Sequence, residues 1–283
     1  MKISAKNIIY SFIGALVFAA AGIALRIYSL FNCFDKEIGY YATEAVLPDV
    51  FHILCVSVCV LSLASVFLLP STKKTEYITC RKAGIFGKIG AIFAIVGSAT
   101  YAMYSLVSLS DDIPPAFGPM AQTSIIKAVS LFVMIFGVLA VIYFALVFVG
   151  KTEKNDNHAI LGYCVILFSL MILAKSYFDF YTTMNSPNKL LSQTTLMLCM
   201  LYMLCELRFS LGISVPRLYS GISLAAIYFT LVSSVPGIVA FCAGILNKVE
   251  YLLCDFVLLT YAIYICARYA EFALAQKKNS EVK

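Results

Sequence analysis

Long runs of apolar residues alternate with short polar segments along the whole chain. Each run has about 20 residues or more, the length of helix that crosses a hydrocarbon core about 30 Å thick. In lipid every backbone N–H and C=O needs an internal partner, so such runs predict helices. We therefore expect an all-α fold, a polytopic transmembrane helical bundle of about eight helices in one integral membrane domain over residues 1–283. The expected helices cover residues 8–31, 50–69, 86–109, 125–149, 159–178, 190–209, 218–242 and 250–273.

Two features leave other divisions of the chain open. Two lysines and an apolar stretch ending in alanines at 19–21 resemble a secretory signal peptide, whose removal would leave seven helices. The apolar run continues as far as Leu30, where polar mature sequence would be normal, so we favour a retained first helix. Similar polar segments follow the first and fifth runs, which leaves open a parallel repeat of four helices over residues 1–150 and 151–283, although few residues are identical between the two halves.

The composition agrees with lipid as the solvent. Hydrophobic residues make up 61% of the chain and charged residues 13%, whereas soluble domains contain about 25% charged residues. Too little polar surface would remain to cover a soluble fold of this size. The net charge of +6 is spread over short loops, so we expect the lipid bilayer, and no nucleic acid, as a partner.

The basic residues are divided unequally between the two sides of the bundle. Fifteen of the 21 Lys and Arg residues lie on the side of the two chain ends and the second, fourth and sixth loops. The positive-inside rule therefore predicts cytoplasmic N- and C-termini, with a short cytoplasmic tail over 275–283. On this side we also expect contacts with anionic lipid headgroups. The residues proposed for these contacts are Lys73, Lys74, Arg81 and Lys82.

Aromatic and small residues suggest how the helices sit. Trp is absent, so tyrosine has to supply the aromatic belts at the membrane interfaces. Small residues such as Gly14 and Gly22 predict close helix approach. Pro236 predicts a kink in the seventh helix, because its ring removes one backbone hydrogen bond. The tyrosines expected near helix ends are Tyr28, Tyr40, Tyr41, Tyr77, Tyr177, Tyr181, Tyr219, Tyr251 and Tyr269.

Several ionisable residues fall inside the predicted spans, where they are costly and point to function. Those that lie about one turn inside the outer boundary are Arg26, Lys127, Lys175 and Asp255. Together they would line an outward-facing pocket for an anionic or zwitterionic ligand. The alternative is that the cations extend to lipid headgroups and that Lys175 pairs locally with Asp179. The candidate ligand-binding residues are Arg26, Lys127, Lys175, Asp179, Asp255, Asn185 and Asn188.

At the opposite, inner ends, Glu206 on the sixth helix and Arg268 on the eighth either pair between helices or anchor each helix separately. The chain has two histidines, and we place His158 in a cytoplasmic loop. It lacks the HExxH, CxxC, GxSxG and P-loop motifs. We therefore predict no catalytic residues, no metal site and no cofactor.

Two segments resemble parts of a group of bacterial multi-spanning membrane proteins with no assigned activity. They are LRIYSLFNCFDKEIGYY, after the first apolar run, and YFDFYTTMNSPNKLL, between the fifth and sixth runs. The resemblance covers about thirty residues, all expected on the outer side. It implies a bacterial plasma membrane as the setting.

Three functions remain open at this point. The favoured one is a transporter or permease subunit for a small anionic or zwitterionic solute. The alternative is a membrane sensor or accessory protein that binds a lipid or a protein partner. The third, a lipid-modifying membrane enzyme, would need Asp179, Asp255 or Glu206 to be functional.

Overall fold

The computed structural model describes residues 5–35, 38–42, 45–68, 83–110, 120–150, 156–178, 186–211 and 216–281. Over these residues the fold is all-α, as predicted, apart from one short ribbon of two strands. The helices are α1 (Ala5–Asn32), α2 (Val46–Leu68), α3 (Ile85–Ser110), α4 (Met120–Val149), α5 (Asp156–Tyr177), α6 (Pro187–Ser210), α7 (Pro216–Cys242) and α8 (Val249–Glu281).

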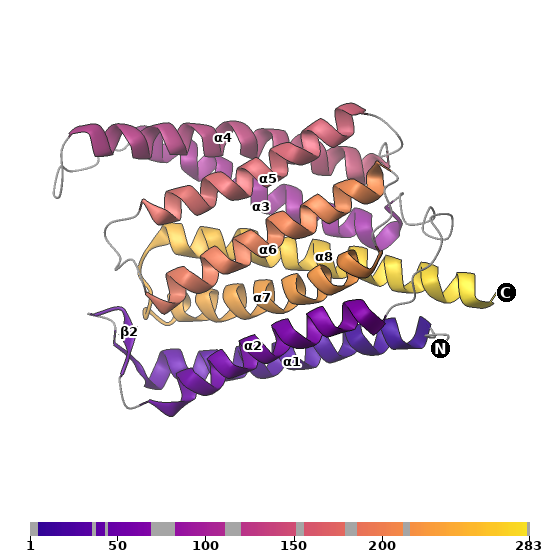
Figure 1. The fold of residues 1–283 in the computed structure, drawn as a ribbon. Coiled ribbons are helices and arrows are strands. Elements are labelled where there is room, and N and C mark those ends of the chain that lie inside the picture. Colours follow the sequence, from indigo (N-terminus) through magenta and orange to yellow (C-terminus); the bar gives the residue numbers. More distant parts are fainter. Residues whose placement is uncertain are drawn as a thin grey trace.

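Each of the eight helices contains an apolar span of 20 to 27 residues, long enough to cross a membrane. The expected boundaries agree with these spans to within a few residues. Figure 1 shows both termini at one end of the bundle, which we call the termini end, and the opposite end we call the far end. The chain is thus built as a multi-pass membrane protein. That the N- and C-termini face the cytoplasm remains a prediction from the charge distribution.

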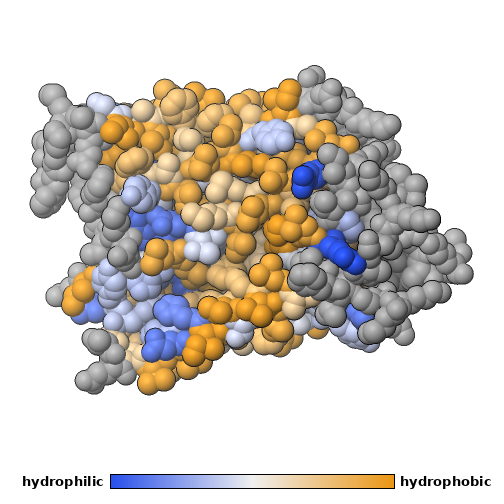
Figure 2. Space-filling model, in the orientation of Figure 1, coloured by the Kyte–Doolittle hydropathy of each residue, from blue (hydrophilic) through white to orange (hydrophobic). Residues whose placement is uncertain are grey.

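The outside of the bundle is apolar. On the face seen in Figure 2, hydrophobic residues cover most of the described surface, and hydrophilic residues lie mainly nearer the two ends. Large side chains such as Val17 on α1, Ile53 on α2 and Met103 on α3 are more than 60% exposed. Exposure of such residues in a soluble protein would be costly, whereas in lipid it is the expected state.

Helix α7 occupies the centre of the packing. It lies against α1, α2, α6 and α8, while α3, α4 and α5 form the neighbouring part of the bundle (Figure 1). Within its most apolar stretch 72% of the α7 residues are buried, against 22% for α1. A side chain that reaches α7 from a neighbouring helix is therefore screened from lipid.

Small residues bring the neighbours close to α7. At Gly22 of α1, an added Cβ would lie 2.9 Å from both the Tyr228 hydroxyl and Val232 Cγ2 of α7. The expectation of close approach is thus confirmed at Gly22. It is wrong at Gly14, where an added Cβ would meet nothing within 4 Å.

The ribbon between α1 and α2 was not expected from the sequence. Strand β1 (Phe34–Asp35) pairs antiparallel with β2 (Tyr40–Tyr41), and Gly39 makes the turn with φ of 79°. Phe34 and Tyr41 pack on a small cluster of Leu30, Ala240 and Ile245, from the ends of α1 and α7. The ribbon therefore covers the junction of α1 and α7 at the far end.

Three local expectations differ from the structure. Tyr219 and Tyr269, expected at the interface, are 3% and 0% exposed and pack inside the bundle. His158 lies within α5, not in a loop, and its ring stacks on Tyr143 with centroids 4.7 Å apart. Most of the expected C-terminal tail continues α8, which ends at Glu281.

Candidate functional site

Arg26 is the most deeply placed cation of the far-end half. It follows Gly22 by one turn of α1, so it points to the same side as that glycine, toward α7. Its side chain is 2% exposed. Nη1 donates to the carbonyl oxygens of Val232 at 2.6 Å and Ser233 at 2.8 Å. The guanidinium is thus held by the backbone of α7 and does not extend to a headgroup.

The bonded carbonyl of Val232 is the one that Pro236 leaves without a helical donor. In an α-helix the N–H of residue 236 would bond to this oxygen, and proline has no N–H. Arg26 supplies the missing donor from another helix, as buried backbone groups in lipid require. Pro236 and Arg26 therefore form one structural unit.

Helix α6 adds a third element to this unit. Ser186 caps α6, and its side chain accepts a hydrogen bond from the Lys189 N–H at 3.3 Å. The cap places Asn188 in the first turn, where its Oδ1 accepts from Arg26 Nη2 at 3.1 Å. The structure thus brings two of the candidate ligand-binding residues, Arg26 and Asn188, into direct contact.

Asp255 of α8 reaches α7 from the other neighbouring helix. It is 5% exposed and lies directly against Gly237, where a methyl group would overlap its carboxylate. Within the described part of the chain the carboxylate makes no hydrogen bond and no ion pair. Arg26 lies near enough to act on it electrostatically. Arg26, Asn188 and Asp255, with Pro236 and Gly237 of α7, make up what we call the α7 site.

Tyr41 of the ribbon closes the α7 site toward the far end. Burial raises the pKa of Tyr41, and the nearby Arg26 guanidinium opposes this rise. The phenol therefore stays neutral at physiological pH and presents its hydroxyl group near Arg26. The two-stranded ribbon that carries Tyr41 therefore lies over the α7 site at the far end.

The other predicted cations lie elsewhere. Lys175 of α5 approaches Glu250 Oε1 of α8 at 3.5 Å, with its ammonium 4.9 Å from the Tyr104 ring centroid and 5.9 Å from that of Tyr101. Lys127 is half-buried on α4, which packs against α3 and α5. The structure thus joins neither of them to Arg26 by a hydrogen bond or ion pair. Asp179 and Asn185, and the four basic residues of the second loop, lie outside the described residues.

A polar stripe on α6, which the sequence analysis missed, leads away from the α7 site. Its members recur every three or four positions, so they share one face of the helix. Ser192 lies 3.4 Å from the Ser233 hydroxyl, and Thr195 donates to the Phe229 carbonyl at 3.4 Å. This spacing was the signal that could have revealed it. The stripe consists of Asn188, Ser192, Thr195, Cys199, Tyr202 and Glu206.

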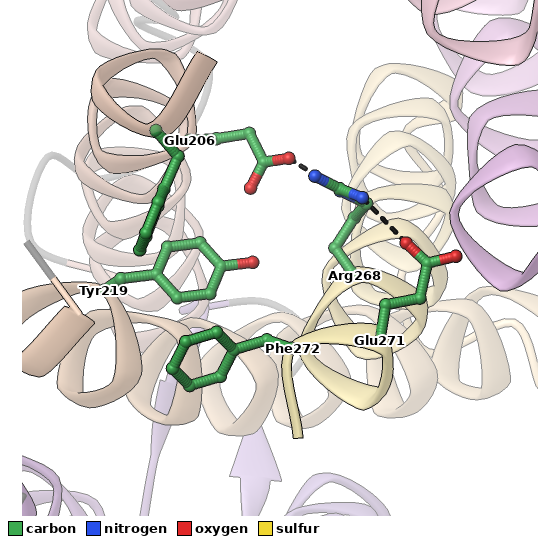
Figure 3. A pocket seen from close by; sticks show the side chains of 6 residues that line it. Glu206, Tyr219, Arg268, Glu271 and Phe272 are labelled. Atoms are coloured by element: carbon green, nitrogen blue, oxygen red, sulfur yellow. Dashed lines mark hydrogen bonds and ion pairs between the residues drawn. The ribbon is translucent and has the colours of Figure 1, made fainter. Parts of the chain in front are cut away.

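The stripe ends in an ion-paired cluster at the termini end (Figure 3). Arg268 Nε donates to Glu206 Oε1 at 2.6 Å, so of the two alternatives left open by the sequence the structure shows the pair between helices. Arg268 Nη1 also donates to Glu271 at 2.7 Å, and Glu271 accepts from the Gly87 N–H at 2.7 Å. The cluster ties α6, α8 and the start of α3 together.

A small pocket opens beside this cluster. Its volume of about 10 Å³ has room for about one water molecule. In this conformation the pocket therefore has no space for a solute. We call the ion pairs of Arg268 with Glu206 and Glu271, which join the helices here, the lock. The pocket is lined by Glu206, Phe209, Tyr219, Arg268, Glu271 and Phe272.

Other chemistry is limited in the described residues. They contain no group of three His, Cys, Asp or Glu side chains placed to hold a metal ion. Nine cysteines are free in this part of the chain, four of them buried. The α7 site itself offers a guanidinium, an amide and a carboxylate, which can bind charged groups and exchange a proton.

Fold and site together define an α-helical multi-pass membrane protein with a charged site inside the bundle. Compared with known proteins, the chain matches no protein-family model, no curated protein and no solved structure. The resemblance of the two segments at residues 25–41 and 177–191 to bacterial membrane proteins stays a prediction.

Proposed function

We propose that this protein transports a small anionic or zwitterionic solute and binds it at Arg26 in the α7 site. The observation that carries the proposal is the burial of a cation that makes no ion pair among the described residues. Charged residues inside membrane spans are expensive and mark ligand pathways. A guanidinium binds carboxylate or phosphate with two parallel hydrogen bonds, so an anionic group is its natural ligand.

The missing backbone N–H at Pro236 supports transport as the function. Solute sites of many transporters lie where a spanning helix is interrupted and backbone groups are exposed to the interior. Here the exposed carbonyl of Val232 is held by Arg26. When a solute anion engages Arg26, the bond to α7 has to weaken, which would couple binding to movement of this central helix.

The stripe on α6 supports a route through the bundle. It runs from Asn188 in the α7 site to Glu206 in the termini-end cluster, on a face directed at α7 and α8. Thr195 and Cys199 are fully buried between these ends. The structure would then represent a closed state, with Tyr41 over one end of the route and Arg268 over the other.

A membrane sensor or accessory protein is the second candidate. The small volume of the termini-end pocket, which holds about one water molecule, and the full burial of Thr195 on the α6 stripe favour it. Such a protein would use the α7 site to respond to a ligand without moving it. Transport and sensing are separated by whether a bound solute crosses the membrane.

The setting that we propose is a bacterial plasma membrane with both termini in the cytoplasm. The basic second loop would then face anionic lipid headgroups through Lys73, Lys74, Arg81 and Lys82. A protein partner would fit the accessory role better than the transport role.

The test is solute uptake by the purified protein in liposomes. Probe solutes are inorganic phosphate, lactate, glutamate and glycine, which sample anions and a zwitterion. We expect at least one to enter faster than into empty liposomes, and Arg26→Gln to lower that rate at least tenfold. No uptake of any probe would overturn the transport proposal.

Two controls protect the test from a folding defect. Arg208→Gln removes an equally charged but exposed side chain and should transport like the wild type. Arg26→Gln combined with Pro236→Ala restores the helical donor to the Val232 carbonyl, so this double variant should fold well. Full uptake by the double variant would remove Arg26 from the binding site.

A further inference from the structure

We propose that Asp255 is a proton-exchanging carboxyl group and that its proton is coupled to anion binding at Arg26. The coupling part rests on the proposed transport function, whereas the proton site itself stands on the geometry of Asp255. An exchangeable proton at this position would make the transported unit an anion together with a proton. The protein would then be driven by a proton gradient.

The first argument is the isolation of the Asp255 carboxylate. It is 95% buried, in the span of α8, and receives no hydrogen bond from the described residues. A buried charge without donor or counter-ion costs several kcal/mol. A bound cation removes that cost, so the site is built for one.

The second argument is a comparison within the chain. Glu206 is equally buried, at 6% exposure, but Arg268 donates to it at 2.6 Å and Tyr202 at 3.3 Å. The Glu206 carboxylate therefore has two hydrogen-bond donors, whereas the Asp255 carboxylate has none among the described residues. A purely structural acid at Asp255 would be expected to have the support that Glu206 has.

The third argument selects the proton over a metal ion. Hard metal cations need about six oxygen ligands around them. Gly237 presses on Asp255 from α7, and the carbonyl oxygens of Val232 and Ser233 are engaged by Arg26. A proton needs only the carboxylate oxygen and fits this crowded position.

The charged surroundings then give the coupling. From the helices packed on α8, Arg26 of α1 is the charged group that acts on Asp255. On α8 itself, Cys254 is adjacent and Glu250 lies five residues earlier, near Lys175. On α3, Tyr101 interacts electrostatically with Glu250 and Cys254, and on α6, Cys199 interacts with Cys254.

Arg26 and Asp255 have opposite charges and act on each other across α7. When Asp255 is ionised it offsets the charge of Arg26 and weakens the attraction for a solute anion. When Asp255 holds a proton, Arg26 is uncompensated and attracts the anion more strongly. Proton and anion therefore favour each other's binding, and by linkage the effect is reciprocal.

The direct test uses dicyclohexylcarbodiimide, an apolar reagent that modifies protonated carboxyl groups, on the full chain in liposomes. Mass spectrometry of the peptides should show modification at Asp255 that decreases as the pH is raised. Glu206, held by Arg268, is the control within the same sample and should react at least tenfold less. Absence of reaction at Asp255 across the pH range, or reaction independent of pH, would overturn the proton site.

Salt identity tests the metal alternative in the same experiment. At constant pH, sodium chloride and choline chloride should leave the reaction at Asp255 equal. Protection by sodium alone would overturn the proposal, because the resident cation would then be a metal ion. This assay needs no transported solute, so it tests proton binding at Asp255 even if the transport proposal fails.

The coupling is tested with Asp255→Asn, which mimics the protonated state. With the probe solute that the wild type moves, exchange of labelled for unlabelled solute should become faster in the wild type as the pH is lowered, and the variant should lose this pH dependence. It should lose accumulation driven by an imposed pH gradient. Gradient-driven accumulation by the variant would overturn the coupling, and loss of exchange as well would mean that Asp255 binds the solute instead.

Discussion

Arg26 of α1 donates its shortest hydrogen bond, 2.6 Å, to the carbonyl oxygen of Val232 on α7. That oxygen lacks its usual helical donor because Pro236 stands four residues later. A proline in the central helix and a buried arginine on another helix thus explain each other. The proline of the central helix and the buried Arg26 therefore belong to one feature, and a ligand that engages the guanidinium would act on α7.

The first prediction concerns the interdependence of these two residues. Arg26→Gln should lower the free energy of unfolding by ~1–3 kcal/mol, because the Val232 carbonyl is left unsatisfied in the interior. In a Pro236→Ala background the restored N–H serves that carbonyl, so the same substitution should cost about 1 kcal/mol less. A double-mutant cycle from reversible unfolding in mixed micelles measures the difference.

Independent behaviour would contradict this interpretation. If the two substitutions add to within about 0.5 kcal/mol, the residues are not coupled. Arg208→Gln, in which an exposed arginine changes, serves as the control and should stay within about 0.5 kcal/mol of the wild type in both backgrounds.

The second prediction concerns the lock at the termini end. Arg268→Met leaves the buried carboxylate of Glu206 without its partner, and should cost ~3–5 kcal/mol of unfolding free energy. Adding Glu206→Gln removes the stranded charge and should recover more than half of that loss. Thermal unfolding in detergent checks both variants, and a loss no larger than that of Arg208→Gln would show that the pair contributes little.

The helices were predictable because their signal is local. A run of about 20 apolar residues is sufficient to specify a spanning helix, and the eight expected runs match the eight spans. The ribbon at Phe34 and Tyr41 was missed because strands of two residues carry no periodic pattern. Its position depends on packing against Ala240 and Ile245, which are distant in sequence.

The candidate site was predictable only in part. The sequence marks Arg26 and Asp255 as costly charges, and the structure places both beside α7. The sequence alone does not show that Lys175 approaches Glu250 on another helix, because partners between helices depend on helix rotation. Nor does it reveal the role of Pro236, since the missing N–H becomes informative only when the donor from α1 is seen.

The third prediction concerns the contact between Gly237 and Asp255. Gly237→Ala should lower the unfolding free energy by ~1–3 kcal/mol, because the added methyl overlaps the carboxylate of Asp255. Asp255→Ala in the same chain frees that space and should restore stability. Gly14→Ala is the matched control, since nothing lies within 4 Å of its added Cβ, and it should gain ~0.5–1 kcal/mol from better helix propensity. Equal effects at the two glycines would contradict the close contact.

The last prediction concerns the orientation of the bundle. Both termini lie at the end toward which most of the basic residues are expected, so that end should face the cytoplasm. A green fluorescent protein fused to the C-terminus should fluoresce, and alkaline phosphatase fused there should be inactive. Phosphatase inserted in the turn at Ile38 and Gly39, at the far end, should be active, because the enzyme needs the oxidising outer compartment. The reverse pattern would turn the bundle over and place the Arg268 lock outside. It would also move the α7 site to the cytoplasmic half, so the proton that reaches Asp255 would enter from the cell interior.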